Sequence, residues 1–285
     1  NFFQVNPSLQ GGANVTGNGD TTSYHSMQVE LRRRLSNGLQ FQSSYVYGRG
    51  YQSVFTSFRK PRFDIEDGGA EGNVVHALKA TWLYELPFGQ GKRWGNSFGP
   101  IMERLVGGWQ IHGTTRIQSG RLIDFGNVRM VGFDRNDLRD MFQLRIDSNQ
   151  RVWMLPQAVI DETVKAFNVS ATSATGYGSL GPPSGQYFAP ANGPDCLEVA
   201  PGFGDCGARS VVVRGPMFKT MDISLTKLVP LAGRTRAEFR FEMLNAFNVV
   251  NFTPISGVGS TTASGYELTG ADAARIVQIV TRISW

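Results

Sequence analysis

The sequence has no run of about 18 apolar residues, and this absence excludes a membrane-spanning helix. Charged residues make up only 18% of the 285, whereas ordinary soluble domains carry roughly a quarter. The first stretch of the chain is polar and rich in Gly and Asn, so no charged and then apolar leader opens it. We therefore expect either that a leader has been removed or that the chain is part of a longer protein.

Residues that carry chemistry are few. The three histidines, His25, His76 and His112, fall on different predicted strands, which favours isolated polar residues over a metal site. The acidic stretch 134–140 lacks the Gly and the closing Glu of an EF-hand loop, which predicts a solvated loop or a short helix. No Ser or Cys nucleophile stands in a catalytic motif. We therefore expect no enzymatic activity, no catalytic residues, no cofactor and no bound metal.

The net charge of +5 is spread along the predicted strands, which disfavours binding to nucleic acid because that function needs a clustered basic patch. The only two cysteines are Cys196 and Cys206, and neither has a His or a third Cys nearby, which disfavours zinc. We predict a disulfide between them, formed within a loop in an oxidising compartment.

Alternation of apolar and polar residues with a period of two is abundant, and this pattern indicates β-strands. The strands are about 9–14 residues long, which is the length that a tilted strand needs to cross a bilayer. One face is rich in Gln, Thr, Arg and Glu, as in a wet lumen, and the other is apolar with aromatics near its ends. A soluble β-sandwich also alternates, but its strands are shorter. The alternating segments are 23–35, 39–47, 76–86, 108–120, 221–228, 236–247 and 274–285.

Short and long connections between these strands follow one another along the chain. Asn37-Gly38 supplies the positive φ angles of a tight hairpin turn, and a second short turn lies near Gly233. The connection 87–106 is intermediate in length. A helix near 156–168 is predicted inside the longest loop, either as a lid or as structural filler. Because strands alternate in direction, the three long polar connections should gather at one rim as outer loops; they are 49–72, 120–211 and 251–272.

An ordered set of short motifs resembles a known family. An R-G-P-x-F element leads into a D-x-S-L strand, and after a short turn the next strand ends in F-N-x-x-N-F. This set resembles the C-terminal region of TonB-dependent outer-membrane receptors, in the subgroup with an N-terminal carboxypeptidase-regulatory-like domain. The matching residues are Arg214, Gly215, Pro216, Phe218, Asp222, Ser224, Leu225, Phe247, Asn248, Asn251 and Phe252.

The resemblance implies an all-β fold, an antiparallel meander of about seven long strands that forms the C-terminal portion of a transmembrane β-barrel. Residues 1–285 would then be one C-terminal fragment of the barrel domain, without signal peptide and plug domain. The protein would sit in the bacterial outer membrane as the barrel wall and extracellular loops of a transporter for an unidentified large substrate.

The resemblance also implies three partners: outer-membrane lipid, the TonB energy-transducing complex through the missing N-terminal region, and the barrel assembly machinery. That machinery would read the apolar end of the last strand, Ile279, Ile283 and the terminal Trp285, as an insertion signal. A function of another class stays open, namely a secreted or surface β-rich adhesin or glycan-binding module. Such a module would be soluble, whereas a barrel wall would need detergent.

Overall fold

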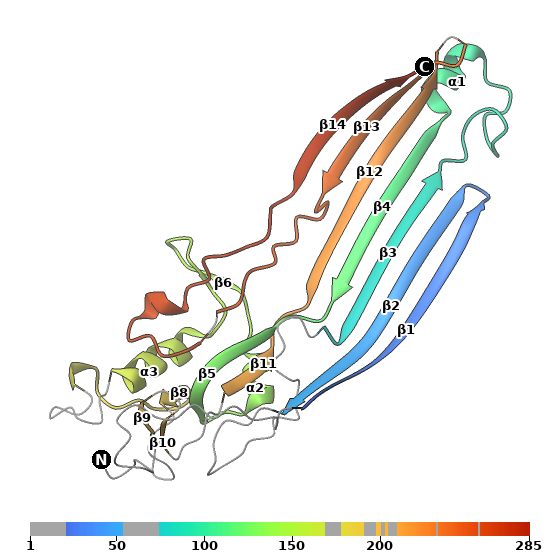
Figure 1. Cartoon of the computed structure of the whole chain (residues 1–285). Helices are drawn as coiled ribbons and strands as arrows, with labels where there is room; N and C mark the ends of the chain where they lie inside the picture. Colours follow the sequence, from blue (N-terminus) through green and yellow to red (C-terminus); the bar gives the residue numbers. More distant parts are fainter. Residues whose placement is uncertain are drawn as a thin grey trace.

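The computed structural model describes residues 21–53, 74–168, 178–190, 198–200, 203–204, 210–231, 233–255 and 257–285. Its main feature is a sheet of seven long antiparallel strands in the order β1-β2-β3-β4-β12-β13-β14 (Figure 1). The predicted all-β meander is therefore confirmed. The strands are β1 (Thr21–Ser36), β2 (Leu39–Ser53), β3 (His76–Glu85), β4 (Trp109–Gln118), β12 (Phe218–Pro230), β13 (Arg236–Leu244) and β14 (Ile276–Ser284).

The two ends of the sheet differ. At one end, which we call the turn end, Asn37 and Gly38 turn the chain with φ angles of 52° and 78°. The helix α1 (Pro100–Val106) and the C-terminus lie at this same end (Figure 1). The opposite end, which we call the loop end, carries all the other helices and short strands of the described residues. Figure 1 shows the described residues of the connections 120–211 and 251–272 gathered at this one rim, as predicted for them.

The strand register places all the predicted apolar residues on one face. A single row across six strands runs through Ile279, Phe241, Leu225, Ile111, Tyr84 and Leu39. The neighbouring row on the other face runs through Gln278, Glu242, Ser224, His112, Leu83 and Gln40. Because paired residues of antiparallel strands share a face, this row of apolar side chains runs across one side of the sheet.

Two strands depart from their predicted limits. β13 ends at Leu244, whereas the alternation predicted a strand as far as Phe247. Asn245 takes a positive φ of 50°, which turns the chain out of the sheet, and its backbone N–H donates to Asp222 Oδ1 at 2.8 Å. β2 extends to Ser53, so the first residues of the predicted loop 49–72 belong to the strand.

A second body lies at the loop end, and we call it the loop module: the described residues of 120–214 together with those of 251–272. Its sheet has the strand order β11-β5-β8, and a small hairpin joins β6 to β7. Its elements are β5 (Leu122–Val131), α2 (Arg135–Asp140), β6 (Arg145–Ile146), β7 (Val152–Trp153), α3 (Gln157–Phe167), η1 (Gly178–Leu180), β8 (Tyr187–Pro190), β9 (Glu198–Ala200), β10 (Phe203–Gly204), β11 (Ser210–Arg214) and η2 (Ala263–Tyr266).

The loop module holds the main hydrophobic core of the described residues. Phe125, Leu138, Ile160 and Phe188 are buried, and Phe125 stacks on Phe188 with ring centroids 5.1 Å apart. Tyr266 joins them from the second loop. The two connections 120–211 and 251–272 were expected as polar outer loops, but they form one packed body. α3 confirms the helix predicted near 156–168, and α2 falls in the acidic stretch 134–140.

None of the helices in the described segments is long and apolar enough to cross a membrane. Cys196, Cys206 and most of the loop 49–72 lie outside the described residues, so the disulfide stays a prediction.

Candidate functional site

The loop module joins the sheet where two chain segments cross. β4 continues through Gly120 into β5, and β11 continues through Gly215 into β12. A Cβ added at Gly120 would lie 2.1 Å from the carbonyl oxygen of Gly215, so only glycine permits this approach. Arg214 Nη1 donates to the Gly120 carbonyl at 3.0 Å, and Gly215 N–H donates to the Arg121 carbonyl at 2.9 Å. The R-G-P element is therefore the seam between sheet and loop module.

The other motif residues brace the same seam. Asp222 accepts hydrogen bonds from the Asn245 N–H at 2.8 Å and from Thr114 Oγ1 at 3.1 Å. Asn251 bonds to both backbone groups of Lys219, accepting at 3.3 Å and donating at 3.0 Å. Asn248 accepts from the Arg275 N–H at 3.0 Å. These side chains satisfy backbone groups where the strands end, so the motif has a structural role.

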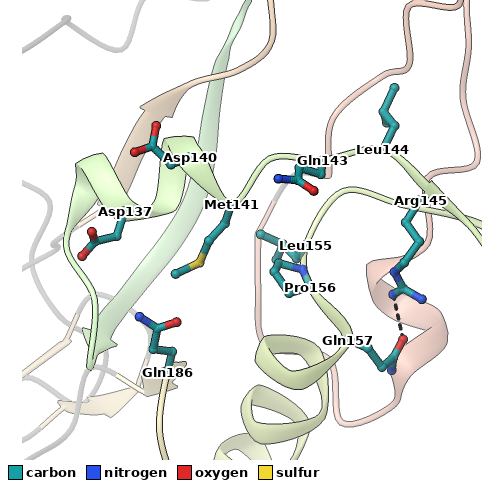
Figure 2. A pocket seen from close by; sticks show the side chains of 10 residues that line it. All are labelled: Asp137, Asp140, Met141, Gln143, Leu144, Arg145, Leu155, Pro156, Gln157 and Gln186. Atoms are coloured by element: carbon teal, nitrogen blue, oxygen red, sulfur yellow. Dashed lines mark hydrogen bonds between the residues drawn. The ribbon is translucent and has the colours of Figure 1, made fainter.

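A pocket of about 750 Å³ opens in the loop module, within the size range of ligand sites. It lies between α2, the segment leading to β6, and the start of α3 (Figure 2). Apolar and amide side chains line its middle, and charged side chains line its sides. The lining residues are Asp137, Asp140, Met141, Gln143, Leu144, Arg145, Leu155, Pro156, Gln157 and Gln186.

Residues of opposite charge lie at the two ends of the pocket lining. Figure 2 shows Asp137 and Asp140 on the α2 side, and Arg145 on the far side beyond Met141 and Gln143. The carboxylate of Asp140 forms no hydrogen bond or ion pair with the described residues. Arg145 Nη2 donates to Gln157 Oε1 at 2.8 Å, which leaves further guanidinium donors for a ligand. The pocket can hold a molecule that carries groups of both signs around an apolar middle.

Hydrogen bonds also order the β6–β7 turn and α3, which lie next to the pocket lining. In the β6–β7 turn, desolvation raises the pKa of Asp147, but hydrogen bonds from the Arg151 and Asn149 backbones and from the Trp153 and Arg151 side chains outweigh it and hold that pKa below its usual value. On α3, hydrogen bonds from Lys165 Nζ and the Ser184 N–H lower the pKa of Glu162. Both carboxylates stay ionised near neutral pH, so the hydrogen bonds that they accept persist at that pH.

The structure places the predicted site residues as follows. Ile279, Ile283 and Trp285 lie on the apolar face of the edge strand β14, or directly after it, and Trp285 is 93% exposed. The three histidines lie on different strands, β1, β3 and β4, and His76 Nδ1 is 2.7 Å from Tyr45 Oη. Within the described residues, no group of three or more His, Cys, Asp and Glu side chains could hold a metal ion.

The sequence did not reveal the pocket. Its residues come from three elements of the long connection, and no spacing relates them. A usable signal was present in the apolar residues Ile123, Phe125 and Val128 along 122–131, because several apolar residues close together favour a buried strand inside a stretch that otherwise looks like a loop.

The fold and the site define a class of protein: a long-stranded sheet with one apolar face, of the kind that crosses a membrane, and a folded module on one rim. The family model described as outer membrane beta barrel domain matches residues 2–278, and the chain belongs to that family. The protein is a β-barrel protein of the bacterial outer membrane. A comparison with curated proteins finds no match.

Proposed function

We propose that the chain forms barrel wall and extracellular loops of a TonB-dependent transporter for a large substrate, and that it has no enzymatic activity. The observation that carries this proposal is the loop module, a packed body with an open pocket on the rim of an outer-membrane sheet. A protein that formed only barrel wall and bound no ligand would need only short loops at that rim. The ordered R-G-P-x-F, D-x-S-L and F-N-x-x-N-F motifs support the TonB-dependent subgroup.

In this proposal the pocket is the first capture site for substrate. Asp140 and Arg145 present opposite charges on its two sides, and the amides of Gln143, Gln157 and Gln186 add donors and acceptors between them. Carboxylates and guanidinium groups form the stronger, charge-assisted hydrogen bonds. The substrate would therefore carry both cationic and anionic or amide groups.

The proposed partners follow from the same arrangement. The apolar face contacts outer-membrane lipid. The energy-transducing complex would dock on a region N-terminal to this chain, where a plug domain would also lie. The assembly machinery would read the exposed end of β14, so Trp285→Asp should lower the fraction of the protein that reaches the folded state, whereas Ser284→Ala should not.

Cross-linking of the complete protein in living cells tests the transport proposal. We expect an adduct between its N-terminal region and the TonB energy-transducing protein, and none when the docking segment is deleted. Absence of any adduct in cells that hold the folded barrel would contradict energised transport. An adhesin would then be favoured, especially if the complete protein is released from membranes without detergent.

A further inference from the structure

The connection 87–106 at the turn end carries an exposed apolar helix. In α1 (Pro100–Val106), the exposed fractions of the residues are 76% for Ile101, 47% for Met102 and 63% for Leu105. Trp94 and Phe98, earlier in the same connection, are exposed as well. Exposing large apolar side chains to water costs free energy, and a connection between two strands does not require such side chains.

Two contacts hold the C-terminal end of α1 against the apolar face of the sheet. The Trp109 indole N–H donates to the Leu105 carbonyl at 3.0 Å. Lys227 Nζ donates to the Gly107 carbonyl and lies 5.4 Å from the centroid of the Trp109 ring. Trp109 and Lys227 are paired neighbours on β4 and β12, in the same face as Phe239 and Leu225. Because this is the face that meets lipid, the C-terminal end of α1 lies where the lipid-facing surface ends.

The polar part of the helix points back into its own connection. Glu103 Oε2 accepts from the Gln90 N–H at 2.7 Å, and a Cβ added at Gly107 would lie 2.2 Å from Glu103 Oε1. The basic residues Arg93 and Arg104 belong to the same connection, and the Arg93 guanidinium lies 5.3 Å from the Trp94 ring centroid. Lys92, in the same connection, forms an ion pair with Glu85. An apolar side, a basic rim and an indole are the features of an interfacial membrane anchor.

We propose that α1 is an in-plane anchor that inserts Ile101, Met102 and Leu105 into the adjacent leaflet of the outer membrane, with the basic residues against phospholipid headgroups. The occupant is the lipid leaflet, because the helix is continuous with the lipid-facing surface and its net basic connection complements anionic headgroups. This inference goes beyond transport, since it depends only on residence in the membrane. With the loop end outside the cell, the leaflet is the periplasmic one.

Photo-cross-linking of the complete protein in vesicles of phosphatidylethanolamine and phosphatidylglycerol tests the anchor. Benzoylphenylalanine in place of Ile101 should give lipid adducts at a yield about tenfold above the same probe in place of Gln90. Gln90 is a matched control, because its side chain is exposed in the same connection. Heat-modifiable migration of both variants verifies that the barrel is folded.

A lipid yield at Ile101 no higher than that at Gln90 would overturn the anchor, because the apolar side of α1 would then have no preferential contact with lipid. A protein adduct at Ile101 in whole cells, without lipid adducts, would also overturn it and assign the helix to a periplasmic partner. Neither result bears on energised transport, which the N-terminal cross-link tests separately.

Discussion

Neighbouring residues on one strand lie in opposite environments, because their side chains point to different faces of the sheet. On β13, Arg240 lies on the polar face and bonds to Glu238 and to Glu242, the latter at 3.0 Å. Its neighbour Phe241 is exposed on the apolar face, between Leu225 and Ile279. In a membrane, the first side chain belongs to a wet surface and the second to hydrocarbon.

We therefore expect Phe241→Arg to cost about 2–4 kcal/mol of unfolding free energy if the residue lies near the midplane of the bilayer. The control Arg240→Gln should cost at most about 1 kcal/mol, because it removes partly exposed ion pairs. Urea unfolding of the complete protein in lipid vesicles measures both. A larger cost for Arg240→Gln would show that the strand has been assigned inside out.

The phenol of Tyr266 gives a pH-dependent prediction in the loop module. Burial raises its pKa to about 12 from 10.0, and its hydroxyl donates to the Ser260 carbonyl at 3.1 Å. Since the folded state holds this proton more tightly, the stability gained is full below pH 10.0 and is lost as the pH rises to about 12. Ultraviolet titration of phenolate should show a late step that Tyr266→Phe removes. A titration curve with the same late step in that variant would refute the assignment.

At the element scale, the seam between β4, β5, β11 and β12 depends on contact between two backbones. A methyl group at Gly120 would meet the Gly215 and Pro216 carbonyl oxygens at 2.1 and 2.2 Å, and neither backbone can move without parting the sheets.

We expect Gly120→Ala to destabilise the loop module by about 1–3 kcal/mol while the barrel stays folded. Limited proteolysis should cut the loop module several-fold faster, and heat-modifiable migration should be unchanged. Gly99→Ala is the matched control, since nothing lies within 4 Å of its added Cβ and its φ is −66°. Equal rates of cleavage of the two variants would mean that the close contact between Gly120 and Gly215 does not stabilise the loop module.

The sequence predicted the seven strands because each of them carries its own alternation, which is a local signal. It did not predict the loop module, because Tyr266 and Ile255 complete a core with Phe125 from far along the chain. The alternation of β13 also continues to Phe247, and only the positive φ of Asn245 ends the strand. The pocket was missed for the same reason as the core: Asp140, Arg145 and Gln157 meet only through the fold.

At the scale of the whole molecule, β1 and β14 are the edges of the described sheet, and both are exposed along their described side chains. In hydrocarbon an unpaired strand edge costs several kcal/mol for each backbone group. We therefore propose that each edge pairs with a further strand to close the barrel. This proposal agrees with the expectation that the chain is part of a larger barrel wall.

Sidedness follows from the gathering of the long connections at one end. Protease added to intact cells should cut at the loop end, where Arg151 is exposed in the β6–β7 turn, and should spare the turn at Asn37 and Gly38. Antibodies to the two regions measure the fragments, and cells with a broken outer membrane serve as the control. Cleavage at the loop end only after that breakage would reverse the topology.

The entry and exit of the loop module lie on β4 and β12, which are paired neighbours. The pairing of β4 with β12 therefore does not depend on the chain between Gly120 and Gly215. Evolution can replace the loop module as one unit without changing the register of the sheet. Such a replacement needs two segments of the chain, because Val258 and Leu268 complete the core of the loop module from the second loop. Diversification of ligand specificity in such proteins should then show as correlated replacement of both segments over an unchanged wall.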